Sequence, residues 1–367
     1  MTGLADLVVV SSPLQYVNAA EWRRRRAGGV ADLVLLGDRA GGAAAIDALI
    51  ARDPSLWRRI VRHPGRPQGA GPRMLRDAAD LRHRRSLEAL ARELGERDAV
   101  AFGDFRNVSH RALVASVRHR ELVLLDDGSV APQVAAARRD PATAPAPERF
   151  QPGWFRTALA RAAFGERAPP DPPSLTFFTV YGSLIGPTML SGDRLERHAY
   201  EGWRSRSAAA PRGGDVWLLG SNHAEAGICS PDAYRALIVD GVAALRRAGH
   251  AGPVVYRPHR GERADRAQTL AREAGLTLGG GDGLPVEIAY LDAAVRPARV
   301  VVIASSAADT LSVIDPELPI ARLALPDGYL RRQREHILAV VAGHDAFNPR
   351  LVVLKPAAAS PWTNSIS

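Results

Sequence analysis

Short apolar runs alternate with helical patterns along this chain, and the alternation occurs in two series. In the first series the apolar runs lie at 7–10, 33–36, 99–102 and 122–125, and the helical patterns lie at about 16–26, 41–51 and 84–94. In the second series the apolar runs lie at 216–219, 253–256, 300–303 and 319–323, and the helical patterns lie near 231–248, 262–274, 286–295 and 328–342. Because this alternation is typical of parallel sheets, the sequence predicts an α/β protein with two Rossmann-like domains.

A chain of 367 residues is longer than a domain with a single hydrophobic core usually is, which also favours two domains. We expect a first domain at 1–175, a linker or hinge at 176–212, a second domain at 213–345 and a C-terminal tail at 346–367. A proline- and alanine-rich segment at 141–173 contains aromatic, aliphatic and arginine residues at helical spacing between 154 and 164. That piece suits either contact with a membrane surface or packing on its own domain, and we favour packing.

The chain carries a formal net charge of +9, almost wholly from arginine because Lys355 is the only lysine. Basic character attracts phosphates, acidic polysaccharides, nucleic acid and anionic lipid alike, so it limits the class of partner without choosing one. Arginine-rich blocks occur at 23–26 and 82–85 on predicted helices. We interpret both blocks as solvated helix faces, which is what charge runs usually are.

Several common kinds of site and segment are not indicated. Cys229 is the only cysteine, which excludes intrachain disulfides and thiolate-rich zinc sites, and no HExxH motif is present. The sequence also has no GxxxxGK[ST] phosphate loop and no strand-anchored GxGxxG. No stretch has transmembrane length and no signal-peptide pattern precedes the first strand, so we expect a cytoplasmic protein with no metal.

Two acids follow the predicted strand at 122–125. Asp126, Asp127 and Gly128 suit a turn, and they equally suit a site in which a carboxylate removes the proton of an attacking hydroxyl. Because successive residues leaving a strand project in different directions, both acids cannot point at one atom. One would be catalytic and the other structural.

Basic residues follow the strand that ends near Tyr256. Arg257 and Arg260 flank Pro258 and His259, and a proline-fixed turn between two guanidiniums suits phosphate binding. His259 can donate a hydrogen bond or a proton to a phosphoryl oxygen.

Polar residues also follow the other predicted strands. Ser305 and Ser306 lie between the strand at 300–303 and an alanine-rich helix, where a helix cap and an anion site are compatible. Further candidate nucleotide contacts are Gly220, Ser221, Asn222, Tyr256 and Glu287. Candidate contacts of the donor or acceptor sugar are Ser12, Gln15 and Gly128. In open α/β sheets the carboxyl ends of the strands are where ligands bind.

Taken together, these residues resemble the bacterial GT-B sialyltransferases, the group of lipooligosaccharide sialyltransferases and capsular polysialyltransferases. Those enzymes carry an acidic-acidic-Gly motif, a His-Pro motif and a Ser/Thr pair. The resemblance implies a GT-B fold, two Rossmann-like domains facing each other across a cleft, with Asp126 as the base and His259 as a general acid or phosphate ligand. It also implies that Ser305 and Ser306 hold the phosphate of CMP. Here His259 is followed by Arg260 and not by proline, so the sequence departs from the family pattern at this site.

The reaction implied by the resemblance is an inverting, metal-independent transfer of sialic acid from CMP-sialic acid to a hydroxyl of a cell-surface glycan. A histidine, arginines and helix N–H groups can offset the charge of departing CMP without Mg²⁺. The expected partners are therefore a nucleotide-sugar donor and a glycan acceptor, not nucleic acid. We expect the protein in the cytoplasm, either free or in peripheral contact with the inner membrane. The alternatives among enzymes are a transferase that uses another CMP-activated acid sugar, such as Kdo, or one that uses a nucleoside-diphosphate sugar. The alternative outside enzymes is a basic protein that binds anionic glycan without catalysis.

Overall fold

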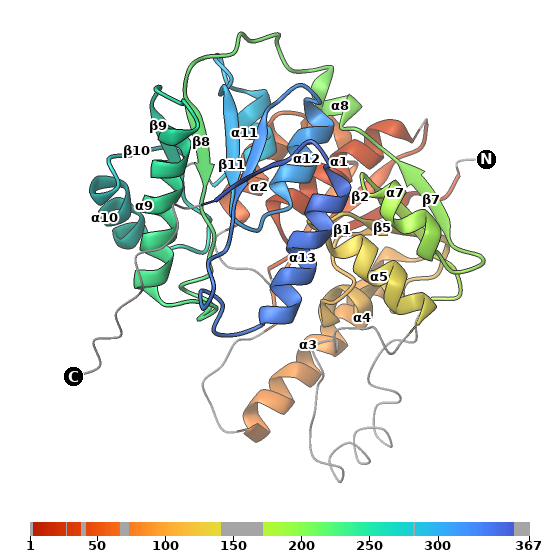
Figure 1. Cartoon of the computed structure of the whole chain (residues 1–367). Coiled ribbons are helices and arrows are strands. Elements are labelled where there is room, and N and C mark those ends of the chain that lie inside the picture. Colours follow the sequence, from red (N-terminus) through yellow and green to blue (C-terminus); the bar gives the residue numbers. More distant parts are fainter. Residues whose placement is uncertain are drawn as a thin grey trace. The chain divides into compact units, whose positions relative to one another are not determined.

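Two separate parallel sheets organise the protein (Figure 1). The computed structural model describes residues 3–26, 28–37, 42–66, 73–140, 172–281 and 283–355. The chain divides into a first unit, Met1–Ser205, and a second unit, Arg206–Ser367, and each unit contains one of the sheets.

The sheet of the first unit has the strand order β3-β2-β1-β4-β5-β6-β7, and its neighbouring strands pair in parallel. Its strands are β1 (Asp6–Val10), β2 (Ala31–Leu36), β3 (Arg59–His63), β4 (Arg97–Phe102), β5 (His119–Leu125), β6 (Thr176–Thr179) and β7 (Arg194–Arg197). The α-helices described in this unit are α1 (Pro13–Arg25), α2 (Ala43–Ala51), α3 (Arg73–Leu94), α4 (Val108–Ser116), α5 (Val130–Arg139), α7 (Gly182–Ile185) and α8 (Glu201–Arg204). Every residue of β1 is buried, as expected for a strand that is covered on both faces.

The sheet of the second unit has the order β10-β9-β8-β11-β12-β13 and is also parallel. Its strands are β8 (Val216–Leu219), β9 (Val254–Arg257), β10 (Thr277–Leu278), β11 (Arg299–Val302), β12 (Ile320–Leu323) and β13 (Val352–Leu354). Its helices are α9 (Pro231–Arg247), α10 (Ala264–Glu273), α11 (Val286–Leu291), α12 (Ala307–Ile314) and α13 (Arg334–Phe347). Side chains such as Leu218, Leu237 and Val301 form its core.

Both strand orders reverse at one point, between β1 and β4 in the first sheet and between β8 and β11 in the second. Ligands of open α/β sheets bind outside the carboxyl ends of the strands at such a switch point. The loops that follow these four strands are therefore the expected ligand-binding loops of the two sheets.

The predicted two-part α/β architecture is confirmed, whereas several boundaries differ. Within the expected linker at 176–212, β6 and β7 extend the first sheet, and the units divide at residue 205. Within the expected tail at 346–367, β13 pairs with β12. Prolines near 172 suggest a loop, but they do not reveal that the short apolar run 176–179 pairs with β5. The predicted helical piece at 154–164 lies outside the described residues.

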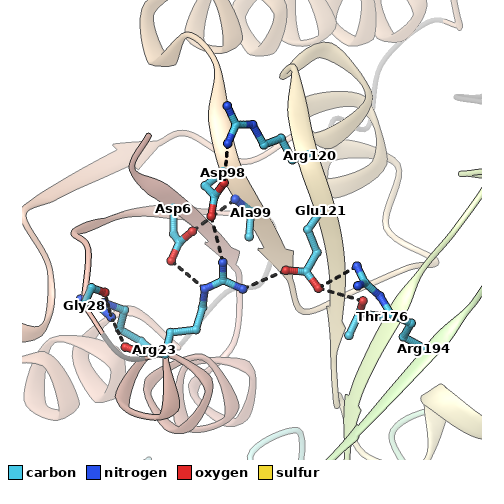
Figure 2. Close-up of polar contacts among 10 residues, drawn as sticks. Asp6, Arg23, Gly28, Asp98, Ala99, Arg120, Glu121, Thr176 and Arg194 are labelled. Carbon is cyan, nitrogen blue, oxygen red and sulfur yellow. Dashed lines mark hydrogen bonds and ion pairs between the residues drawn. The ribbon is translucent and has the colours of Figure 1, made fainter. Parts of the chain in front are cut away.

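The arginine block at 23–26 is a solvated face only in part, because Arg25 is exposed whereas the other three arginines are partly buried. Arg26, at the C-terminal end of α1, contacts three acids: Asp6 at 3.0 Å, Asp98 at 3.2 Å and Glu121 at 2.9 Å. These acids lie near the amino ends of β1, β4 and β5, and Figure 2 shows them grouped with Thr176 and Arg194 beyond Glu121. The network therefore joins strands at the edge opposite to the switch-point loops.

The block at 82–85 is solvated only in part. Arg82 and Arg85 are exposed on α3, whereas His83 is buried and its Nε2 lies 2.9 Å from the Ser109 hydroxyl. Along the described ranges, no helix combines the length and the apolar character that crossing a membrane requires.

Candidate functional site

Three of the candidate residues in the first unit meet at the carboxyl end of β1. Ser12 caps α1, since its hydroxyl accepts the Gln15 N–H at 3.3 Å. The Gln15 Oε1 accepts two hydrogen bonds from Ser11, one from its backbone N–H at 2.8 Å and one from its hydroxyl at 3.2 Å. Two donors thus fix the orientation of the amide, and its Nε2 donates to Asp127 Oδ2 at 3.0 Å. Gln15 is buried, so Asp127 is held from inside the unit.

Asp126 lies deeper than Asp127, and its side chain is turned to other partners. It is 1% exposed, and its Oδ2 accepts the Val180 N–H at 2.8 Å. The buried His198 imidazole places Nε2 3.8 Å from the same oxygen and stacks on Phe178, with ring centroids 4.3 Å apart. Among the described residues, Asp126 Oδ1 has no hydrogen-bond partner. Such an orphaned buried oxygen calls for an explanation, and a catalytic role is one.

Two glycines shape this edge. Gly128 has a φ of 63°, the left-handed region that favours glycine, so the turn after the two acids requires it. Gly103 follows β4, and a Cβ there would lie 2.5 Å from Gln15 Cγ. The absence of a side chain at Gly103 therefore allows Gln15 to reach Asp127.

Gly103→Ala should lower the free energy of unfolding by about 1–3 kcal/mol, because the added methyl overpacks a buried site. In a Gln15→Gly background every side-chain atom that the added methyl would contact is absent, including Gln15 Cβ at 2.7 Å, so the same change should cost much less in urea-induced unfolding. Gly186→Ala is the control, because nothing lies within 4 Å of a Cβ at that position. An equal cost of Gly103→Ala in both backgrounds would contradict the assigned contact.

In the second unit, Gly220, Ser221 and Asn222 follow β8 as predicted. The Ser221 N–H donates to the Tyr234 hydroxyl at 2.7 Å. The neighbouring His223 is buried, with Nδ1 3.0 Å from the Tyr329 hydroxyl. Burial, with a smaller contribution from His259, lowers the pKa of His223 to about 4. The ring is therefore neutral near pH 7.

The loop after β9 holds His259 in one tautomer. The Gly261 N–H donates to His259 Nδ1 at 3.0 Å, so the neutral ring carries its proton on Nε2. Desolvation and the charge of Arg260 lower the pKa of His259, which favours this neutral form. The Arg257 guanidinium lies over the Trp217 ring, 4.2 Å from its centroid. His259 thus presents an N–H donor close to the positive charge of Arg260.

Around β11, the two serines differ in their contacts. Ser305 Oγ accepts the Ala307 N–H at 3.3 Å, which is a helix-capping contact. The Ser306 hydroxyl forms no hydrogen bond with another residue of the described ranges. Since β8 and β11 are adjacent strands, the loops that begin at Gly220 and Ile303 follow neighbouring strand ends.

Glu287 is buried rather than open to a ligand. It is 3% exposed, and its Oε1 accepts the Thr310 hydroxyl proton at 2.6 Å, which joins α11 to α12. Burial raises the pKa of Glu287. The described residues contain no group of three or more His, Cys, Asp or Glu side chains arranged to hold a metal ion.

Sequence reasoning missed His198, His110 and Glu262. His198 follows β7, which lies within the expected linker and has the largely polar sequence Arg-Leu-Glu-Arg, so it carries little strand signal. His110 is buried on α4 with Nε2 3.1 Å from the Ser11 hydroxyl. Glu262 lies three residues after His259, and its spacing from that residue was the one available signal.

The sequence matches no protein-family model, and a search of the curated proteins gave no match either. The structure is similar to the GT-B domain of a sialyltransferase from Photobacterium damselae, with 11% identity, 95% of this chain and 100% of the other covered, and a TM-score of 0.48.

Two further solved structures are similar to comparable extents. A 2,6-sialyltransferase from Photobacterium sp. JT-ISH-224, solved with CMP and lactose, gives 11% identity, coverage of 95% and 78%, and a TM-score of 0.49. TcCGT1, solved with UDP, gives 9% identity, coverage of 97% and 86%, and a TM-score of 0.50. The likeness to TcCGT1 extends over both units, and each unit has the doubly wound order with one switch point. The chain therefore has the GT-B fold, built from two Rossmann-like units.

Proposed function

We propose that the protein is a nucleotide-sugar glycosyltransferase, and that it transfers sialic acid from CMP-sialic acid to a hydroxyl of a cell-surface glycan. The observation that carries the proposal is the state of His259. Its Nδ1 is occupied by the Gly261 N–H, so the neutral ring offers Nε2–H to an anion at the carboxyl edge of the second sheet. Hydrogen-bond donors already in place where negative charge develops are the main way in which such transfers are accelerated.

In the proposed reaction, the acceptor hydroxyl oxygen forms a bond to the anomeric carbon from the face opposite CMP. The bond from that carbon to the phosphate oxygen breaks, and its electron pair leaves with CMP. A carboxylate of the first unit, Asp126 or Asp127, takes the hydroxyl proton. In the second unit His259, Arg260, Ser306 and the first N–H groups of α12 stabilise the charge on the phosphate.

The structural likeness supports the proposal only at the level of the fold. One fold can serve many different sugar donors, so the fold does not choose among them. CMP is favoured over a diphosphate on the sequence motifs, with Kdo-like and nucleoside-diphosphate sugars as the alternatives. A donor screen that measures released nucleotide, run in EDTA, tests the reaction and its proposed metal independence together. Release from CMP-sialic acid supports the proposal, and release from no donor would favour a binder of anionic glycan.

Ser306→Ala should weaken CMP binding by about 1–3 kcal/mol, the scale of a hydrogen bond to a charged group. Ser305→Ala is the matched control, because Ser305 Oγ already accepts the Ala307 N–H. It should lower stability by about 1 kcal/mol and affect CMP binding less. Calorimetric titration with CMP separates the two variants. Unchanged affinity in the Ser306 variant would remove the Ser306 hydroxyl from the phosphate site.

A further inference from the structure

One carboxylate of the second unit accepts hydrogen bonds from several parts of the proposed phosphate site. Glu262 Oε1 accepts the His259 N–H at 2.9 Å and the Tyr234 hydroxyl proton at 3.2 Å. Glu262 Oε2 accepts the Tyr256 hydroxyl proton at 2.5 Å. Both oxygens are therefore in use, and three donors orient the group.

Through Tyr234 the same carboxylate reaches the loop after β8. The Tyr234 hydroxyl accepts the Ser221 N–H at 2.7 Å, and the phenol rings of Tyr234 and Tyr256 are almost fully buried. Backbone groups of two loops, Ser221 after β8 and His259 after β9, are thus bonded to one acid directly or through one phenol.

Gly220 permits this arrangement by its lack of a side chain. A Cβ at Gly220 would lie 2.1 Å from Glu262 Oε1 and 2.6 Å from the Tyr256 hydroxyl. The backbone of the loop after β8 therefore passes directly against the carboxylate. This close approach explains why glycine is needed at position 220, which the sequence pattern alone did not explain.

Glu262 holds its place without a cationic partner. None of the ion pairs among the described residues involves it, although burial raises its pKa and so disfavours its charge. A partly buried acid that is stabilised by hydrogen bonds alone is a costly way to join two loops. An apolar contact would serve stability as well, so the acid is expected to do something that packing cannot.

We propose that Glu262 is the positioning residue of the donor phosphate site. It fixes the loops that begin at Gly220 and Pro258, so that the His259 Nε2–H is held ready for a phosphate before the donor binds. The inference rests on the proposed function, because it assigns a purpose to the same edge of the second sheet. Preorganised donors bind an anion more tightly, because less order is lost on binding.

Glu262→Gln tests the inference, because it keeps the size of the side chain and removes its charge. Gln would present an amide donor to one of the hydroxyl or N–H groups that now donate to the acid. CMP affinity measured by calorimetry should fall about tenfold or more, which is the effect of losing one hydrogen bond to a charged group. Asp265→Asn is the matched control, since it removes the same charge from an exposed acid that pairs with Arg263.

Gly220→Ala supplies a second variant in which the acid is retained but displaced. It should lower CMP affinity to a similar extent. Spectra of ¹⁵N-histidine-labelled protein then separate positioning from general damage. In both variants the ring signals of His259 should shift. The ring signals of His344, which lies on α13 and is buried against Asp309 of α12, should not shift.

Three results would overturn the inference. Full CMP affinity in Glu262→Gln shows that the loops need no such anchor. Shifts of the His344 signals together with a lower melting temperature show a merely structural residue. Failure of the unmodified protein to bind CMP or any other nucleotide refutes the proposed function, and the inference with it. The first two results leave the proposed function standing.

Discussion

Asp126→Asn should lower turnover by about a hundredfold to ten-thousandfold, the usual cost of removing a general base. The asparagine oxygen can still accept the Val180 N–H that Oδ2 accepts at 2.8 Å, so the fold should persist. CMP affinity should change little, because the nucleotide is assigned to the second unit. Release of CMP from CMP-sialic acid measures the rate, and calorimetry with CMP measures the affinity.

Asp127→Asn is the paired variant, and it decides between the two acids. Asp127 is partly buried and accepts the Gln15 amide at 3.0 Å, whereas Asp126 Oδ1 lacks a partner in the described part of the chain. A large loss in the Asp126 variant with a small one in the Asp127 variant assigns the base to Asp126. The reverse pattern would move the base by one residue. Full activity in both variants would remove the pair from the mechanism.

Arg26→Ala should lower the free energy of unfolding by about 3 kcal/mol, the lower end of the cost of breaking a buried ion pair, because Arg26 is partly exposed. The substitution leaves the carboxylate of Asp6, 6% exposed, without its ion-pair partner and with Asp98 and Glu121 nearby. Desolvation already raises the pKa of Asp6 while Arg26 opposes it, so Asp6 should bind a proton more readily in the variant. Urea-induced unfolding at pH 7 measures the effect.

The control for Arg26 lies in the same unit. Arg59 pairs with Glu93, and both side chains are about half exposed. Arg59→Ala should therefore change the stability by no more than about 1 kcal/mol. Equal stabilities for the two variants would show that the Arg26 network is no stronger than a surface pair. CMP affinity should be retained in both, because the nucleotide is assigned to the second unit and both arginines belong to the first.

The architecture was largely predictable from the sequence, because strands covered on both faces must be apolar along their whole length. The run predicted at 216–219 coincides with β8, and the runs at 7–10 and 99–102 lie within β1 and β4. β3 was missed, since its sequence Arg-Ile-Val-Arg-His belongs to an edge strand with one neighbour and carries polar residues. Edge strands need less apolar character, so they leave a weaker signal.

The positions of the candidate residues followed from the same logic, whereas their partners did not. Asp126, His259 and Ser306 were singled out because each follows a predicted strand. Which acid is buried, and what it contacts, depends on Val180 and His198, which lie 54 and 72 residues further along the chain. Local patterns carry no information on such pairs.

The sequence by itself thus determined the two parallel sheets and the strand ends where polar groups gather, since both depend on short-range apolar periodicity. Only the tertiary structure decided that Gln15 contacts Asp127, that Arg26 pairs with three acids, and that Glu262 joins two loops. Those outcomes depend on which charges lose contact with water and which donors remain to compensate them. Burial and hydrogen-bond partners are set when distant segments pack together.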